Sequence, residues 1–108
     1  LTGLSMGGYG SWALASEYPD RFAAVVPICG GGNRMMSLTL MDVPIWAFHG
    51  DADPLVPVER PRDMIAAIKK AGGEPKYTEH KGVGHDAWTP TYRDNKVLDW
   101  LFEQKKGK

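Results

Sequence analysis

The sequence predicts an α/β fold built on a parallel sheet with flanking helices. Strand-like and helix-like segments alternate along the chain, which is typical of this class. The two most apolar runs, residues 22–29 and 44–48, show no alternation of polar and apolar residues. Strands have such continuous apolar sequences when helices cover both faces of a parallel sheet. A chain of 108 residues can bury one modest core, so we expect a single domain over residues 1–108.

The first half of the chain predicts a strand, a helix and two more strands. A strand stub at residues 1–2 precedes a helix over residues 6–18, which Pro19 stops. The apolar runs 22–29 and 44–48 follow as strands. No internal repeat interrupts this order.

The second half predicts helix, strand and helix. A helix over residues 59–71 has Pro61 in its first turn and ends at Gly72 and Gly73. Residues 76–80 are mostly polar, which suits a strand at the sheet edge. A third helix is expected over residues 92–104. Each of these two helices has apolar residues on one face. They are Met64, Ile65, Ile68 and Ala71 in the helix over residues 59–71, and Val97, Leu98, Leu101 and Phe102 in the helix over residues 92–104.

Charge and composition exclude several classes of partner. The 13 Lys and Arg residues balance the 13 Asp and Glu residues, so neither nucleic acid nor a membrane surface is expected as a partner. No apolar run approaches the roughly 20 residues of a membrane span. The Asp51-x-Asp53 pattern does not fit a calcium loop, because Val56 and Arg62 stand where Gly and Glu are needed. No metal or other cofactor is expected.

The clearest chemical pattern lies at the start of the chain. Residues 3–7 read Gly-Leu-Ser-Met-Gly, a Gly-x-Ser-x-Gly nucleophile elbow between a strand stub and a helix. Such a turn lifts the Ser5 hydroxyl clear of the backbone. It also places the Met6 N–H at a helix N-terminus, where it can stabilise an oxyanion.

A serine nucleophile needs a base and an acid, which follow it in the order acid, then histidine, in hydrolases with an elbow. His85 lies in a glycine-rich loop after the last predicted strand and is the expected base. His49 and His80 fall within or at the end of strands and are expected to be structural. Asp51 and Asp53 both follow a strand; we expect Asp53 to orient the base and Asp51 to close its own turn.

These residues resemble serine esterases of the α/β-hydrolase fold, of the phospholipase/carboxylesterase, feruloyl-esterase or "predicted peptidase" type. The resemblance implies Ser5 as nucleophile, Asp53 as acid, His85 as base and the Met6 N–H as an oxyanion donor. It covers nearly all of this chain but only the C-terminal half of the family. Trp88 either lines the acyl or leaving-group pocket or simply packs. The matching segments are residues 3–12, 18–22, 49–54 and 82–88.

The chain also departs from the family pattern. The second oxyanion donor of the family comes from a loop before the elbow, which this sequence lacks. Residues 30–33, Gly-Gly-Gly-Asn, are expected to form a flexible loop rather than to replace it. Cys29, the one cysteine, has no elbow around it and is a weaker candidate nucleophile. A single cysteine cannot form an internal disulfide, so it does not indicate the cellular compartment; a secreted or periplasmic location is compatible with the resemblance.

The leading interpretation is a serine carboxylesterase that hydrolyses a small-molecule ester through an acyl-enzyme. A peptidase would need the same triad. The alternative is a non-catalytic C-terminal fragment that needs an N-terminal half or an oligomer partner. The strand at residues 1–2 would leave an open sheet edge, and helix faces around Trp12 and Leu14 would lack cover. We therefore expect a homo-oligomer or a complex with an N-terminal segment.

Overall fold

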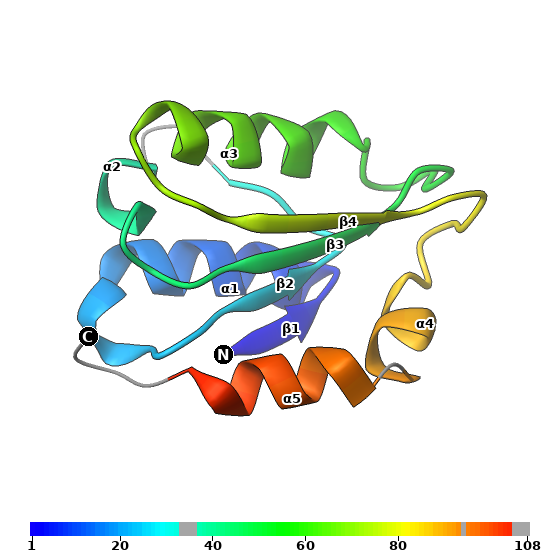
Figure 1. The fold of residues 1–108 in the computed structure, drawn as a ribbon. Coiled ribbons are helices and arrows are strands. Elements are labelled where there is room, and N and C mark those ends of the chain that lie inside the picture. Colours follow the sequence, from blue (N-terminus) through cyan, green and yellow to red (C-terminus); the bar gives the residue numbers. More distant parts are fainter. Residues whose placement is uncertain (33–36, 94, 105–108) are drawn as a thin grey trace.

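The structure is a computed structural model that describes residues 1–32, 37–93 and 95–104. Its sheet has four strands in the order β1-β2-β3-β4, and all neighbouring strands are parallel. Figure 1 shows the strand arrowheads pointing toward the same end of the sheet. The predicted fold class is confirmed. The strands are β1 (Thr2–Leu4), β2 (Val26–Ile28), β3 (Trp46–Gly50) and β4 (Lys76–His80).

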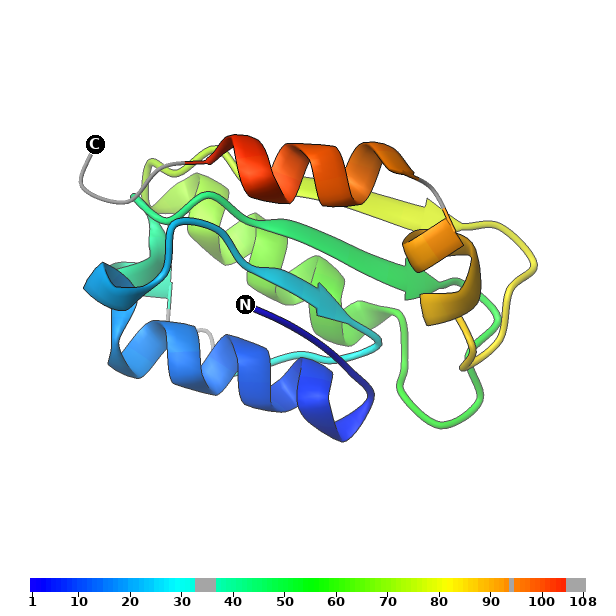
Figure 2. The same cartoon turned by 90° about the horizontal axis from the view of Figure 1, so that it is seen from below.

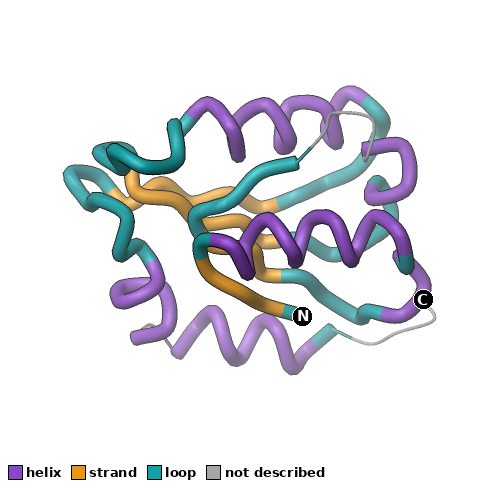
Figure 3. The backbone as a smooth tube through the Cα atoms, turned by 180° about the vertical axis from the view of Figure 1, so that it is seen from behind, coloured by secondary structure: helices purple, strands orange, loops and turns teal. Residues whose placement is uncertain are grey.

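Helices cover both faces of this sheet, with α3 and α5 on opposite sides (Figure 1). Figure 3, seen from behind, shows helices (purple) on both sides of the layer of strands (orange). No helix in the described part of the chain is long and apolar enough to cross a membrane. The helices are α1 (Met6–Glu17), α2 (Ser37–Leu40), α3 (Glu59–Lys70), α4 (Trp88–Arg93) and α5 (Asn95–Glu103), and a 3₁₀ turn, η1 (Pro19–Arg21), follows α1.

The core has two layers, one on each face of the sheet. Around β3, Ile45 and Ala47 belong to the layer that contains residues of α1, α2 and α3. Phe48 belongs to the other layer, and Trp46 packs against it beside residues of α4 and α5. The alternation follows from the strand itself, because successive side chains point to opposite faces. Figure 2 shows α5 and α3 separated by the strands.

Some predicted bounds agree with the structure. β4 coincides with predicted residues 76–80 and lies at the sheet edge, and α3 ends within one residue of the predicted helix. On α3, Met64, Ile65 and Ile68 are buried, which confirms these three residues of the predicted apolar face; Ala71 lies just past α3 as its C-cap and is half-buried. Prolines in the first turn are tolerated because their missing N–H would have no helical partner.

Other bounds are wrong. β2 covers only Val26–Ile28 of the predicted run 22–29, since a continuous apolar run reports burial and does not fix where strand pairing begins. The sequence predicts one helix over residues 92–104. The structure instead has α4, which begins earlier at Trp88 and ends at Arg93, and α5, which covers Asn95–Glu103. The Thr89 N–H donates to the Asp86 carbonyl at 3.0 Å and opens this earlier turn. Lys105 and Lys106 lie outside the described residues.

The expected lack of cover over α1 holds for one side chain only. Trp12 is 1% exposed, whereas Leu14 is 42% exposed. Trp12 belongs to the same core layer as Leu40 of α2, a four-residue helix that the sequence does not predict. The prediction that Trp12 lacks cover is therefore wrong, because a short element packs beside it.

Candidate active site

Ser5 lies on a strained turn between β1 and α1. Its backbone angles are φ 52° and ψ −115°, a conformation that costs a non-glycine residue roughly 1–3 kcal/mol. Its N–H donates to the Ile28 carbonyl at 2.9 Å, and its carbonyl accepts the first helical bond from the Tyr9 N–H at 3.1 Å. Serine often caps a helix with its side chain, but the Ser5 hydroxyl makes no such bond. It is left available for other chemistry.

The turn depends on glycines at two close backbone contacts. A Cβ on Gly3 would lie 2.4 Å from the Gly7 carbonyl oxygen. A Cβ on Gly8 would lie 2.3 Å from the Ile28 carbonyl oxygen, so α1 could not sit so close to β2. The elbow geometry therefore rests on residues without side chains.

The structure brings Ser5, His85 and Asp53 together at the carboxyl end of the sheet. His85 Nδ1 lies 2.7 Å from Asp53 Oδ2, and His85 Nε2 lies 2.7 Å from Ser5 Oγ. Because a carboxylate only accepts, Nδ1–H donates to Asp53 and the neutral ring accepts the Ser5 O–H at Nε2. This arrangement can take a proton from the serine hydroxyl.

Asp53 is fixed by hydrogen bonds to both of its oxygens. Oδ1 accepts from the Leu55 N–H at 2.8 Å and from the Val56 N–H at 2.9 Å, while Oδ2 accepts from His85. Burial raises the pKa of the Asp53 carboxyl, but the bonds from Val56, His85 and Leu55 outweigh it and hold that pKa below its usual value. Asp53 is thus a carboxylate at neutral pH.

The loop that carries His85 crosses closely over the end of β3. A Cβ on Gly50 would lie 2.2 Å from the Val83 carbonyl oxygen. The Ala52 N–H donates to that same oxygen at 3.0 Å, and the Gly82 N–H donates to Asp51 Oδ1 at 2.7 Å. Asp51 therefore joins the loop that carries Asp53 (residues 51–58, the acid loop) to the loop that carries His85 (residues 81–87, the base loop). The expectation that Asp51 closes its own turn is wrong, because its oxygen accepts from a distant segment.

The Met6 N–H is the first donor of α1. The first N–H groups of a helix have no intrahelical acceptor, and the helix dipole makes this end positive. An oxyanion next to Ser5 Oγ would be stabilised there. The glycines after β2 do not form the expected flexible loop: Gly30 and Gly31 are buried, and a Cβ on Gly30 would meet the Gly8 backbone at 2.5 Å. Asn33 lies outside the described residues.

The other two histidines bond within the fold. His49 is fully buried with its Nε2 2.8 Å from the Val56 carbonyl oxygen. His80 Nε2 lies 2.9 Å from Thr91 Oγ1. Neither touches Ser5 in the hydrogen bonds described for these side chains, which agrees with a structural role for both.

Cys29 lies behind the site and is poorly suited to attack a substrate. It is fully buried, and its Sγ donates to the His85 carbonyl at 3.2 Å. Burial raises the pKa of the Cys29 thiol to about 11. Because the thiolate is the nucleophile, a protonated buried thiol is inert at neutral pH.

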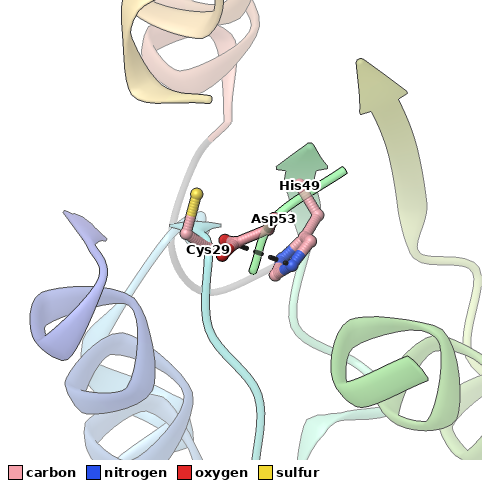
Figure 4. Close-up of side chains that lie close together, drawn as sticks. All are labelled: Cys29, His49 and Asp53. Carbon is pink, nitrogen blue, oxygen red and sulfur yellow. Dashed lines mark ion pairs between the residues drawn. The ribbon is translucent and has the colours of Figure 1, made fainter. Parts of the chain in front are cut away.

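Cys29, His49 and Asp53 form a cluster whose nearest ligand atoms all lie within 4.8 Å of one another. Figure 4 shows the Asp53 carboxylate between the other two side chains, with His49 Nε2 3.6 Å from Asp53 Oδ2. Both Asp53 oxygens, the thiol and His49 Nε2 already make the hydrogen bonds given above. Because these atoms are already hydrogen-bonded within the fold, we do not assign the cluster as a metal centre.

Trp88 stands beside the base. Its ring meets the His85 ring edge-on, with centroids 5.4 Å apart and an interplanar angle of 88°. It also packs against the core layer under α4 and α5. Trp88 thus contacts both the base and the core, so both interpretations of this residue have a physical basis.

The sequence model of the dienelactone hydrolase family matches residues 1–98. The chain belongs to the dienelactone hydrolase family. This family assignment, with the fold, confirms the resemblance to α/β-hydrolase esterases. A solved thermostable esterase is similar to this member of the family, with 45% identity and a TM-score of 0.92 over 95% of this chain. The chain spans 30% of that esterase.

Other similar proteins are more distant. Acyl-protein thioesterase 1 of Gibberella zeae is 30% identical over 74% of this chain, and an uncharacterised secreted protein of Arthroderma benhamiae is 26% identical over 79%. The chain spans 29% and 12% of these two relatives. The solved structure of Arabidopsis thaliana SOBER1 has a TM-score of 0.69 at 24% identity, over 93% of this chain and 48% of that one, and shows the shared fold.

Proposed function

We propose that this member of the dienelactone hydrolase family is a serine carboxylesterase whose triad is Ser5, His85 and Asp53. The supporting observation is the position of the His85 ring, which lies 2.7 Å from the hydroxyl on one side and 2.7 Å from the carboxylate on the other. A base in this position serves both halves of acyl transfer.

In the first half of the reaction, Ser5 Oγ attacks the ester carbonyl and its proton passes to His85 Nε2. The carbonyl oxygen takes the negative charge and accepts a hydrogen bond from the Met6 N–H. When the tetrahedral intermediate collapses, the C–O bond to the alcohol breaks and His85 returns the proton to the leaving oxygen. The acyl group remains on Ser5.

In the second half, water attacks the acyl-enzyme and gives its proton to His85. Collapse releases the carboxylic acid and returns the proton to Ser5 Oγ. Asp53 holds the Nδ1–H tautomer throughout and stabilises the imidazolium that forms in each half. The reaction needs no cofactor.

An ester substrate is favoured over a peptide by the identity of 45% to a protein described as an esterase. A small-molecule ester is the proposed substrate, with the exposed part of Trp88 beside the acyl or leaving group. The same triad would serve a peptidase, so substrate choice depends on binding rather than on these three residues.

Turnover of p-nitrophenyl acetate by the purified chain tests this proposal. Ser5→Ala should remove nearly all turnover, by on the order of 10⁶-fold as in other hydrolases with such a triad, without changing the circular dichroism spectrum. Ser16→Ala is the matched control, because Ser16 is another α1 serine, and its hydroxyl donates to the Ala13 carbonyl of its own helix at 2.8 Å. Turnover that survives Ser5→Ala would contradict the proposal, as would equal losses in both variants.

A further inference from the structure

We propose that His49 is a positioning residue for the acid of the triad, acting through Val56 and Asp53. The inference rests on the proposed function, since it concerns how the Asp53 carboxylate is held against His85. It is carried by three contacts of the buried His49 ring, which lies beside the Asp53 carboxylate in Figure 4.

The first contact fixes the tautomer of His49. Its Nε2 lies 2.8 Å from the Val56 carbonyl oxygen, which can only accept, so the proton sits on Nε2. This bond runs from the end of β3 to a residue six positions past the end of that strand. It therefore closes the whole loop that contains Asp53.

The second contact makes Val56 a shared partner. The carbonyl of Val56 accepts from His49, and the N–H of Val56 donates to Asp53 Oδ1 at 2.9 Å. Displacement of this residue would move the donor on which the carboxylate rests. The chain of hydrogen bonds then continues from Asp53 through His85 to Ser5.

The third contact is electrostatic. His49 Nε2 also lies 3.6 Å from Asp53 Oδ2, the oxygen that accepts from His85. This distance is too long for a hydrogen bond, but it places the polar Nε2–H group next to the carboxylate. The partial positive charge of Nε2–H favours the ionised form of Asp53 electrostatically, and the hydrogen bonds through Val56 hold its orientation.

Burial of the His49 ring costs free energy, and packing alone does not explain why a polar ring lies at this position. His49 is fully buried, and its Nδ1 has no hydrogen-bond partner among the residues that the structure describes. An unpaired buried nitrogen carries a desolvation penalty that a phenyl ring of similar size would avoid. The positioning role accounts for a polar ring at this place.

The experiment compares variants that keep or remove the donor at Nε2. His49→Phe keeps the volume and removes the donor, and His49→Asn keeps a polar side chain too short to reach the Val56 carbonyl. His49→Gln places an amide N–H near the position of Nε2. His80→Phe is the matched control, because this histidine ends the neighbouring strand β4 and its Nε2 lies 2.9 Å from Thr91 Oγ1 on α4.

Two readouts are used with the full chain. One is the rate at which a fluorophosphonate labels Ser5; the other is the low-field proton NMR signal of the His85 Nδ1–H bonded to Asp53. His49→Phe and His49→Asn should slow labelling by roughly 10- to 100-fold, as expected for a misplaced catalytic group, and should weaken or shift the signal. His49→Gln should recover both readouts, and His80→Phe should change neither.

Equal behaviour of the Asn and Gln variants would overturn the inference, as would an unchanged signal in His49→Asn. If His49→Phe does not fold, the Asn and Gln pair still decides. The NMR signal needs no turnover, so a wild-type chain that shows the signal but is never labelled would refute the proposed esterase. The effect of His49 on the Asp53–His85 bond would still be measured in that case.

Discussion

Asp51 and Asp53 are two residues apart in one loop and have opposite surroundings. The Asp53 side chain is fully buried and faces His85, while Asp51 is exposed and accepts from the Gly82 N–H. Both are held by backbone donors, but only Asp53 contacts the base. Their chemistry therefore differs although the residue type is the same.

Substitution separates the two aspartates. Asp53→Asn should lower kcat roughly 10⁴-fold, because an amide nitrogen facing Nδ1 selects the wrong tautomer of His85. The fold should survive, since the asparagine oxygen can still accept from Leu55 and Val56. Asp51→Asn should cost far less, because its oxygen still accepts from Gly82. The measurement is kcat for p-nitrophenyl acetate, and a larger loss at Asp51 would reverse the assignment of the acid.

At the scale of elements, the contact of α1 with β2 sets the site. The first turn of α1 approaches the Ile28 carbonyl so closely that only glycine fits at position 8. Gly10 lies two residues further along α1, and a Cβ added there would meet nothing within 4 Å beyond the adjoining backbone of its own helix. The two glycines thus differ in what surrounds them, although both are helical.

An alanine at each position tests this contact. Gly8→Ala should lower the free energy of unfolding by roughly 3 kcal/mol, because backbone atoms cannot yield as a flexible side chain can. Gly10→Ala should raise it by up to about 1 kcal/mol through helix propensity. Urea unfolding followed by circular dichroism measures both. Equal changes of the same sign would show that α1 does not depend on the close approach.

The elements that could be predicted are those with a strong local signal. The apolar face of α3 and the polar run of β4 come from spacing and composition, and the order serine, acid, histidine pointed to Ser5, Asp53 and His85. The four-residue helix α2 has no periodic signal because it is too short. The bond from Asp51 to Gly82 joins segments 31 positions apart, so only the folded chain shows it.

At the scale of the whole molecule, β1 is one of the two edge strands of the sheet, the other being β4. Within the described residues β1 pairs with β2 alone, and Leu4 and Leu14 nearby are 38% and 42% exposed. An unpaired parallel edge beside apolar side chains favours association. We propose that the chain forms a homo-oligomer or binds an N-terminal segment that completes the sheet.

Sedimentation of the purified chain tests this association. We expect a species heavier than the 11.9 kDa of one chain. With Met6 as the one assigned oxyanion donor, the chain should also turn over roughly 10²- to 10³-fold more slowly than a hydrolase with two such donors. Addition of an N-terminal segment with a second donor should restore that factor. A well-folded monomer with ordinary esterase turnover would contradict the proposal.

The catalytic assignment as a whole is tested most directly by locating the adduct of a fluorophosphonate by mass spectrometry. The account predicts one adduct, on Ser5, because the Ser5 hydroxyl bonds to the His85 base and the Cys29 thiol is buried and protonated. The adduct should disappear in Ser5→Ala and persist in Ser16→Ala. An adduct that remains in Ser5→Ala, or one found on Cys29, would contradict the account.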